Sequence, residues 1–180
     1  MNRDIERILV DEKRLSERVH ELGRAMTADY AGREPLIVGI LRGSFIFMAD
    51  LVRVCDFPCT VDFMVVSSYG GGATSSGNVR ILKDLSEDIS GRDVILVEDI
   101  LDTGRTLYSL RDVLSRRGPA SIRIAALLDK PDRREADITA DYVGFTVPNE
   151  FVVGYGLDYD QRYRTLPYIG ILKPEVYTFS

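Results

Sequence analysis

The stretch VILVEDILDTGRTL, residues 94–107, decides the fold that we predict for this 180-residue chain. Its first four residues are apolar, which is typical of a strand buried on both faces in a parallel sheet. The acidic pair Glu98 and Asp99 follows this run, and a helix is predicted over about 104–117. Ligands bind outside the carboxyl ends of the strands in such sheets, so we expect the functional site where this strand passes into its helix.

Strand and helix patterns alternate on both sides of this stretch. Apolar residues at helical spacing predict a helix over about 12–31, with Asp11 as its N-cap. Further strands are predicted at 36–41, 60–67, 79–82, 122–128, 142–147, 152–155 and 169–172, and a further helix at 45–54. This order predicts one α/β domain, residues 1–180, with a largely parallel central sheet flanked by helices.

The composition is that of a globular protein, with 45% hydrophobic and 28% charged residues. The net charge of −5 gives no general attraction to phosphate backbones, so we expect no nucleic-acid partner. No apolar run approaches the roughly 18 to 20 residues that span a bilayer, and the first residues do not resemble a signal peptide. A cytoplasmic location without a membrane partner is therefore expected.

Few residues are suited to nucleophilic catalysis. The two cysteines, Cys55 and Cys59, lack companion ligands for zinc and are interpreted as reduced thiols. The sole histidine, His20, falls in a charged helical pattern, which disfavours Ser-His-Asp and Cys-His mechanisms. The chemistry is therefore expected to use carboxylates, lysine, arginine or a metal ion.

The residues after the predicted strand are suited to a sugar phosphate. A helix start offers unpaired N–H groups, Gly104 permits close approach of the backbone, and two threonines add hydroxyls. The carboxylates of Glu98 and Asp99 can accept hydrogen bonds from ribose hydroxyls, and without a partner they would cost stability. The simpler alternative is that Asp102 or Thr103 only caps the helix.

Motifs for ATP and NAD fit the chain poorly. Residues 72–77 have the glycine spacing of a P-loop, but Asn78 and Val79 stand where lysine and a hydroxylic residue are required. A strand-linked G-x-G-x-x-G does not occur. A phosphate is therefore expected at residues 102–106 instead.

These residues resemble a known family. The stretch 94–107 is similar to the phosphoribosyl-pyrophosphate signature of the type I phosphoribosyltransferases. The remainder resembles the hypoxanthine-guanine phosphoribosyltransferases through LRGS at 41–44, Ser68-Tyr69, Lys130 and FVVGYGLDYDQRYR at 151–164. The similarity covers about residues 5–175, with an arginine at position 42 where many relatives carry lysine and a serine at 44 where some carry glycine.

The resemblance implies a fold and a reaction. The fold is the type I phosphoribosyltransferase fold, with a core over about 5–130 and a small hood built mainly from about 131–180. The reaction is a purine salvage step, in which the 5-phosphoribosyl group of phosphoribosyl pyrophosphate is transferred to hypoxanthine or guanine. The products are IMP or GMP and pyrophosphate, Mg²⁺ is the implied cofactor, and a homodimer or homotetramer is the implied assembly.

The resemblance also implies roles for residues of this chain. Asp102 is the implied catalytic residue, beside purine N7, and Ser68 and Tyr69 belong to a lid. The peptide bond before Arg42 can be cis in the family. The implied contacts are to ribose and 5'-phosphate from Glu98, Asp99, Ile100, Leu101, Asp102, Thr103, Gly104, Arg105 and Thr106; to the purine from Lys130, Phe151 and Val152; to pyrophosphate from Arg42, Gly43 and Arg164; and to Mg²⁺ from Asp158 with Glu98 and Asp99.

Other interpretations stay open at this point. Without the resemblance, Lys130 would be a solvated lysine, Phe151 a core residue and Asp158 part of an Asx turn. A transferase that prefers xanthine or adenine fits the same motifs. A nucleotide-binding regulator of the same fold is disfavoured, because attenuators generally carry an aromatic residue at the position of Asp102 and repressors add a basic helix-turn-helix domain.

Overall fold

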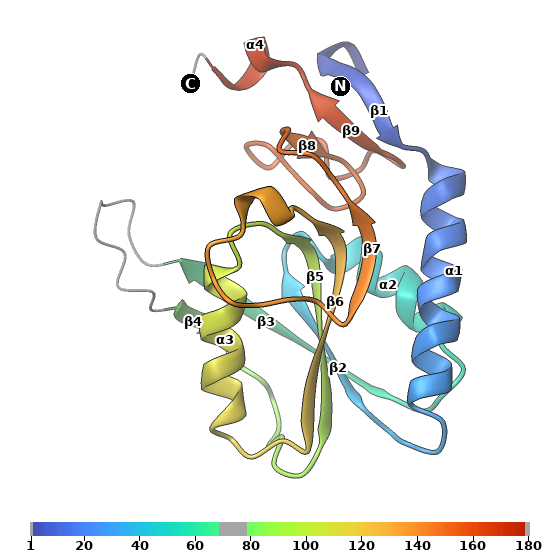
Figure 1. Ribbon diagram of the computed structural model, residues 1–180, viewed down its shortest axis with the longest axis vertical. Coiled ribbons are helices and arrows are strands. Elements are labelled where there is room, and N and C mark those ends of the chain that lie inside the picture. Colours follow the sequence, from blue (N-terminus) through green and yellow to red (C-terminus); the bar gives the residue numbers. More distant parts are fainter. Residues whose placement is uncertain (1, 69–78, 179–180) are drawn as a thin grey trace.

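A computed structural model describes residues 2–68 and 79–178, which form two β-sheets with helices packed around the larger one (Figure 1). The larger sheet has the strand order β4-β3-β2-β5-β6-β7, and the smaller sheet has the order β1-β9-β8. The strands are β1 Ile5–Val10, β2 Leu36–Leu41, β3 Thr60–Ser68, β4 Val79–Lys83, β5 Asp93–Leu101, β6 Ser121–Asp129, β7 Tyr142–Thr146, β8 Val152–Val153 and β9 Ile169–Leu172. The α-helices are α1 Glu12–Asp29, α2 Phe45–Val54, α3 Arg105–Ser115 and α4 Pro174–Tyr177, and two 3₁₀ turns cover Asn2–Asp4 and Pro131–Arg133.

The larger sheet is mixed and mostly parallel, as predicted. Strand β2 lies between β3 and β5 and is parallel to both, and β5, β6 and β7 continue the parallel order. Only the edge strand β4 is antiparallel, to β3. The apolar run LIVGIL matches β2 residue for residue, because a central strand covered on both faces carries apolar side chains throughout.

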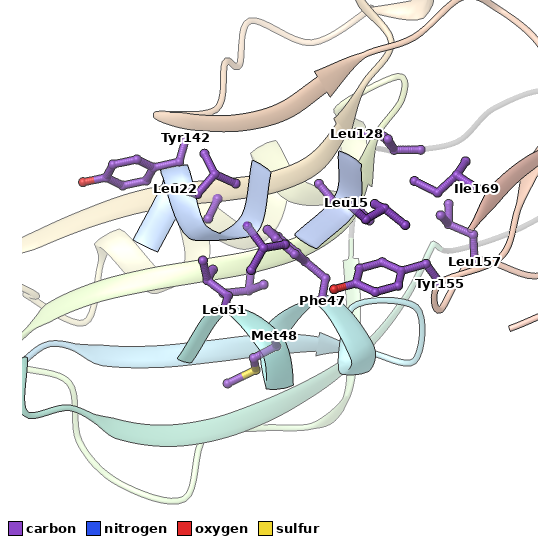
Figure 2. Close-up of a cluster of buried hydrophobic side chains, with 14 of the residues drawn as sticks. Leu15, Leu22, Phe47, Met48, Leu51, Leu128, Tyr142, Tyr155, Leu157 and Ile169 are labelled. Atoms are coloured by element: carbon purple, nitrogen blue, oxygen red, sulfur yellow. The ribbon is translucent and has the colours of Figure 1, made fainter. Parts of the chain in front are cut away.

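Helices cover both faces of this sheet (Figure 1). Helix α1 begins where predicted, since the Asp11 carboxylate accepts a hydrogen bond from the Arg14 N–H at 2.8 Å. Its buried stripe includes Leu15 and Leu22, which pack with Phe47 and Leu51 of α2 in the main hydrophobic cluster (Figure 2). Each fully buried side chain of this kind contributes about 1.5–3 kcal/mol through removal from water. Helix α3 lies on the opposite face (Figure 1).

Strand β5 is longer than the apolar run that predicted it. The prediction ended the strand at Val97, whereas the structure extends it to Leu101. Pairing with β6 continues through Ile100 opposite Leu128 and Leu101 opposite Asp129. The backbone ladder therefore holds the acidic pair in extended conformation, even though its side chains interrupt the apolar pattern.

The small sheet contains strands from both sides of the boundary predicted between core and hood. It takes β1 from the N-terminal end of the chain, which was assigned to the core, and pairs it with β9 from the C-terminal end. Strand β7, which falls in the range assigned to the hood, pairs with β6 in the larger sheet instead. Backbone pairing over long sequence separations decides both cases, and it places the small sheet above the larger one (Figure 1).

Two further predictions concern the loop and the membrane. Ser68 ends β3, while Tyr69 and the rest of the predicted lid, to residue 78, lie outside the described residues. Within the part of the chain that the structure describes, no helix combines the length and the apolarity that crossing a membrane requires.

Candidate active site

Two adjoining cavities lie at the carboxyl ends of β2 and β5. The loop cavity, of about 450 Å³, is bordered by the segment after β2, the end of β5 and the residues leading to α3. The aromatic cavity, of about 610 Å³, is bordered by the end of β6 and by residues of the small sheet. Both cavities are lined by Asp99, Ile100, Asp102 and Asp158, so a single ligand can occupy the two.

The structure brings most of the predicted site residues to these cavities. Those lining the loop cavity are Arg42, Gly43, Glu98, Asp99, Ile100, Leu101, Asp102, Thr103, Gly104, Thr106, Asp158 and Arg164. Those lining the aromatic cavity include Lys130, Phe151 and Val152. Arg105 lines neither cavity, and its exposed side chain forms an ion pair with Glu135. A further cavity of about 590 Å³ between α1 and α2 is lined by none of the predicted residues.

The acidic pair is held tightly at the end of β5. Burial, and next the neighbouring Asp99 carboxylate, raise the pKa of Glu98 well above its usual range. Burial also raises the pKa of Asp99, whose Oδ1 accepts a hydrogen bond from the Ile100 N–H at 2.9 Å. A Cβ at Gly43 would lie only 1.5 Å from Asp99 Oδ2. The two carboxylates are thus fixed in a site that favours a hydrogen-bonding or cationic ligand.

The residues between β5 and α3 form a turn that needs glycine. Gly104 is the N-cap of α3 with a φ of 79°, in the left-handed region that favours glycine. Because Gly104 occupies the N-cap position and no side chain makes a cap hydrogen bond there, Asp102 is not the helix cap that the simpler alternative assumed. Thr103 Oγ1 accepts only a long hydrogen bond, 3.5 Å, from the Arg105 N–H.

Asp102 has one carboxylate oxygen without a hydrogen bond. Its Oδ1 atom is buried, although the side chain as a whole is 39% exposed. Arg133 Nε lies 2.9 Å from this oxygen and forms an ion pair with it, but the contact lacks the geometry of a hydrogen bond. A buried acceptor in this state is suited to a donor supplied by a ligand.

Lys130 and Phe151 differ from the simpler interpretations of the sequence. Lys130 is only 7% exposed, its Nζ donates to the Glu150 carbonyl at 2.7 Å, and burial lowers its pKa. Phe151 is not a core residue, because it is 36% exposed. Its ring stacks on Tyr177 at 4.9 Å between centroids and meets Tyr159 edge-on at 5.5 Å. The aromatic cavity therefore offers a ring face beside a buried ammonium group.

Arg42 and Arg164 lie at the other end of the site and share one partner. Gln161 Oε1 accepts from Arg42 Nη1 at 2.7 Å and from Arg164 Nη2 at 3.2 Å. Arg164 also donates to the Gly156 carbonyl at 2.7 Å. The Leu41-Arg42 peptide bond is cis, as the resemblance suggested it can be. Gln161 was not among the predicted residues, since only the fold brings it between the two guanidinium groups.

Asp158 is the predicted metal ligand that borders both cavities. Its Oδ1 lies 2.9 Å from Arg164 Nη2, and its Oδ2 accepts from the Gln161 N–H at 2.8 Å, so a local turn hydrogen bond is also present. No cluster of three or more His, Cys, Asp or Glu suited to a metal occurs among residues 2–68 and 79–178. The carboxylates fit Mg²⁺ nevertheless, because this ion takes few protein ligands and completes its shell with substrate oxygens and water.

Comparisons with known proteins decide the family. The family model described as the phosphoribosyl transferase domain matches residues 5–160. The hypoxanthine-guanine phosphoribosyltransferase of Streptococcus thermophilus is 54% identical over 177 residues, which are 98% of each chain. The chain belongs to the hypoxanthine-guanine phosphoribosyltransferase family. The predicted family and fold are confirmed.

Two further proteins are similar to this chain at comparable identity. A solved hypoxanthine phosphoribosyltransferase from Staphylococcus aureus superposes with a TM-score of 0.96 at 52% identity, covering 98% of this chain and 96% of that one. The bifunctional protein TilS/HprT of Listeria innocua is 56% identical over 178 residues, 99% of this chain. This chain spans only 28% of the length of that bifunctional relative.

Several residues of this phosphoribosyltransferase site were not predicted from the sequence. Arg133 contacts Asp102, Arg134 contacts the backbone before Gly104, and Tyr177 stacks on Phe151. The pair Arg133-Arg134 follows Lys130 closely after a buried strand, which is a signal that could have placed both beside the end of β5. Tyr177 gives no such signal, because it lies far along the chain from its partner.

Proposed function

We propose that this chain transfers the 5-phosphoribosyl group of phosphoribosyl pyrophosphate to hypoxanthine or guanine. The observation that carries the proposal is the position of Asp102, which borders both the loop cavity and the aromatic cavity. A sugar phosphate in the first and a purine in the second would meet at this carboxylate. The names of the relatives that match the whole chain support the same activity.

The loop cavity would hold the phosphoribosyl group. Glu98 and Asp99 would accept hydrogen bonds from the two ribose hydroxyls, and these neutral donors suit carboxylates whose pKa values are raised. Backbone N–H groups at 102–106, with the hydroxyls of Thr103 and Thr106, would bind the 5'-phosphate. The guanidinium groups of Arg42 and Arg164 would bind the pyrophosphate.

Asp102 would act on the purine. Bond formation from a purine nitrogen to C1' of the ribose breaks the bond to pyrophosphate and leaves positive charge on the base. A carboxylate beside N7 can take the N7 proton or hold it while that charge develops. The Oδ1 atom of Asp102, which is buried and without a hydrogen bond, supports this role, because it would be available to accept the proton.

Lys130 and Phe151 would select the base. The Lys130 ammonium has three donors and no acceptor, and one donor is already used by the Glu150 carbonyl. The remaining donors suit a 6-oxo group and not the exocyclic amine of adenine. The exposed ring of Phe151 would stack on the purine, with the backbone of Val152 at its edge.

Mg²⁺ is the proposed cofactor, held by Asp158 with Glu98 and Asp99 as further candidate ligands. When bound, the ion would supply positive charge that offsets the negative charge on the leaving pyrophosphate. The expected homo-oligomer, the cytoplasmic location and the lid role of Ser68 and Tyr69 stay predictions of the sequence.

The decisive experiment is a set of initial rates of pyrophosphate release with hypoxanthine, guanine, xanthine and adenine, each with and without Mg²⁺. We expect turnover with hypoxanthine or guanine that requires Mg²⁺. If the highest rate is measured with xanthine or adenine, the proposed specificity for hypoxanthine or guanine is wrong. Binding of a nucleotide without turnover of any purine would favour the regulator, which a salt-dependent RNA shift assay then tests.

The role of Asp102 has its own test. Asp102→Asn is expected to lower kcat by roughly 10² to 10⁴ while largely sparing the KM for phosphoribosyl pyrophosphate, because the amide cannot take the N7 proton. Asp56→Asn makes the same charge change at an exposed position outside both cavities and should leave kcat unchanged. An Asp102→Asn enzyme with unchanged kcat would remove this carboxylate from catalysis.

A further inference from the structure

The segment 134–138 packs against the turn that precedes α3, on the side away from the loop cavity. The turn residues Leu101–Gly104 line that cavity, whereas no residue of 134–138 does. A Cβ at Gly104 would lie 2.6 Å from Ile138 Cγ2 and 3.0 Å from Arg134 Cδ. We call residues 134–138 the brace.

The brace binds three consecutive carbonyl groups of the turn. Arg134 Nη2 donates to the Leu101 carbonyl at 3.0 Å, and Arg134 Nε donates to the Asp102 carbonyl at 3.0 Å. The N–H groups of Glu135 and Ala136 donate to the Thr103 carbonyl at 3.0 and 3.1 Å. The Leu101 carbonyl also accepts from the Lys130 N–H at 3.0 Å, so the carbonyls of residues 101–103 point toward the brace and the end of β6.

The planarity of the peptide unit fixes the direction of the N–H groups that follow these carbonyls. In a trans peptide unit the carbonyl of one residue and the N–H of the next point in opposite directions. Carbonyls 101–103 point toward the brace, so the N–H groups of residues 102–104 point to the opposite side, where the loop cavity lies. Several convergent N–H groups bind a phosphate well only if their directions are fixed beforehand.

Arg134 itself is firmly held. Its side chain is 17% exposed, it forms an ion pair with the Asp129 carboxylate, and its Nη1 donates to the Ile138 carbonyl at 2.7 Å. Asp129 ends β6 opposite Leu101, so the guanidinium group is anchored to the same pair of strands whose end it organises. A planar group with several donors suits this task, and a lysine ammonium could not make all of these contacts at once.

We propose that Arg134 is a positioning residue that directs the backbone N–H groups of Asp102 and Thr103 toward the 5'-phosphate of phosphoribosyl pyrophosphate, while the N–H groups of Glu135 and Ala136 do the same for Gly104. Arg134 sets the affinity for the phosphoribosyl substrate without touching it. This inference rests on the proposed function for the identity of the substrate. It adds a residue that the sequence-based site did not contain.

The test compares Arg134→Met with a matched control, Arg18→Met. Arg18 also donates from its guanidinium to two backbone carbonyls, of Gly144 at 2.9 Å and Val143 at 2.8 Å, but outside both cavities. Both variants lose an arginine that binds backbone. We measure kcat, the KM of each substrate, thermal unfolding, and the Kd of ribose 5-phosphate by calorimetry.

For Arg134→Met we expect a rise of roughly tenfold or more in the KM for phosphoribosyl pyrophosphate and in the Kd of ribose 5-phosphate. The KM for hypoxanthine and kcat should stay within about twofold, because a phosphate bound equally in ground state and transition state affects mainly KM. Arg134→Lys should give values of the KM for phosphoribosyl pyrophosphate and of this Kd between those of the wild type and Arg134→Met. Arg18→Met should resemble the wild type in kcat, both KM values, thermal unfolding and the Kd.

Three results would overturn the proposal. One is a Kd of ribose 5-phosphate for Arg134→Met within about twofold of the wild type. Another is an equal loss for both substrates, or an equal loss in Arg18→Met, which indicates a general structural effect. The third is that the wild type does not bind ribose 5-phosphate.

Two provisions keep the outcome decisive. If Arg134→Met does not fold, Arg134→Lys and Asp129→Asn are measured in its place. Asp129→Asn weakens the ion pair that anchors the Arg134 guanidinium, while the asparagine keeps the shape of the aspartate. If the wild type releases no pyrophosphate with any purine, the proposed function fails, and the calorimetric Kd values still decide the role of Arg134.

Discussion

Gly43 shows how a single residue fixes the position of a charged group. The Asp99 carboxylate lies against the Cα of Gly43. The Gly43 carbonyl oxygen in turn lies only 2.1 Å from the position that a Cβ at Gly156 would take. Three segments, after β2, at the end of β5 and near Asp158, therefore meet without space for a methyl group. The loop that we propose to bind pyrophosphate is thus packed directly on the carboxylates that we propose to bind ribose.

Gly43→Ala is expected to displace the Asp99 carboxylate, because the new Cβ would lie 1.5 Å from Oδ2. We expect kcat/KM for phosphoribosyl pyrophosphate to fall by roughly tenfold or more. A double-mutant cycle with Asp99→Ala provides the control, since the overlap is absent once the carboxylate is removed. Additive effects of the two substitutions would contradict this account of Gly43.

Asp62 connects the edge strand β4 and the segment after it to strand β3 of the larger sheet. It lies on β3 with its side chain 14% exposed, and it accepts from Lys83 Nζ of β4 at 2.8 Å and from the Ser86 N–H at 2.6 Å. Desolvation acts to raise the pKa of Asp62, but the hydrogen bonds from Lys83, Ser86 and Phe63 lower it to about 2. The charged carboxylate therefore stabilises the attachment of β4 and the segment after it.

Asp62→Asn is expected to lower the free energy of unfolding at pH 7 by about 1–2 kcal/mol. A carboxyl whose pKa is depressed in the folded state stabilises it above the unfolded pKa, near 3.8, and this contribution is lost as the pH falls toward 2. The difference between variant and wild type should shrink over that window in urea titrations. The stabilising role of the Asp62 charge would be contradicted if the difference in unfolding free energy were constant from pH 7 to pH 2. It would also be contradicted if the exposed substitution Asp56→Asn gave the same difference.

Elements whose side chains are buried on both faces were predicted well from the sequence. Strand β2 and the middle of β6 are continuous apolar runs, and no partner had to be known to recognise them. Strand β1 was missed because most of its side chains are exposed or half-buried, and only its pairing with β9 makes it a strand. The end of β5 was missed for the same reason, since pairing continues where the apolar pattern stops.

The candidate site divides in the same way. Residues contiguous in sequence, such as 98–104, could be predicted together because the end of one strand and one turn carry them. Arg134 and Gln161 act through backbone carbonyls and through other side chains, and these partners are brought near only by the fold. Sequence patterns locate groups that face a ligand more readily than groups that hold them.

At the scale of the whole molecule, the site joins the two sheets. The loop cavity lies at the end of the larger sheet and is also bordered by Asp158 and Arg164, while the aromatic cavity takes Phe151, Val152 and Ile171 from the small sheet and its neighbours. Arg7 of β1 pairs with Glu150 at 2.6 Å, and the Glu150 carbonyl accepts from Lys130, so the small sheet is linked to the end of β6 as well. A ligand that fills both cavities would therefore stabilise the arrangement of the sheets.

IMP is expected to raise the melting temperature more than ribose 5-phosphate and hypoxanthine added together at the same concentration, since only the nucleotide spans both cavities in one molecule. At about 100 times its Kd, the nucleotide should add roughly 2.7 kcal/mol and raise the melting temperature by about 5–10 °C. Stabilisation by phosphoribosyl pyrophosphate should depend on Mg²⁺ and be lost with a chelator. Stabilisation by IMP should not depend on Mg²⁺, because IMP lacks the pyrophosphate that would bind the ion. Differential scanning calorimetry measures these shifts. Equal shifts for IMP and for the separate mixture would mean that the two cavities are occupied independently, and the purine and phosphoribosyl sites would then have to be assigned anew.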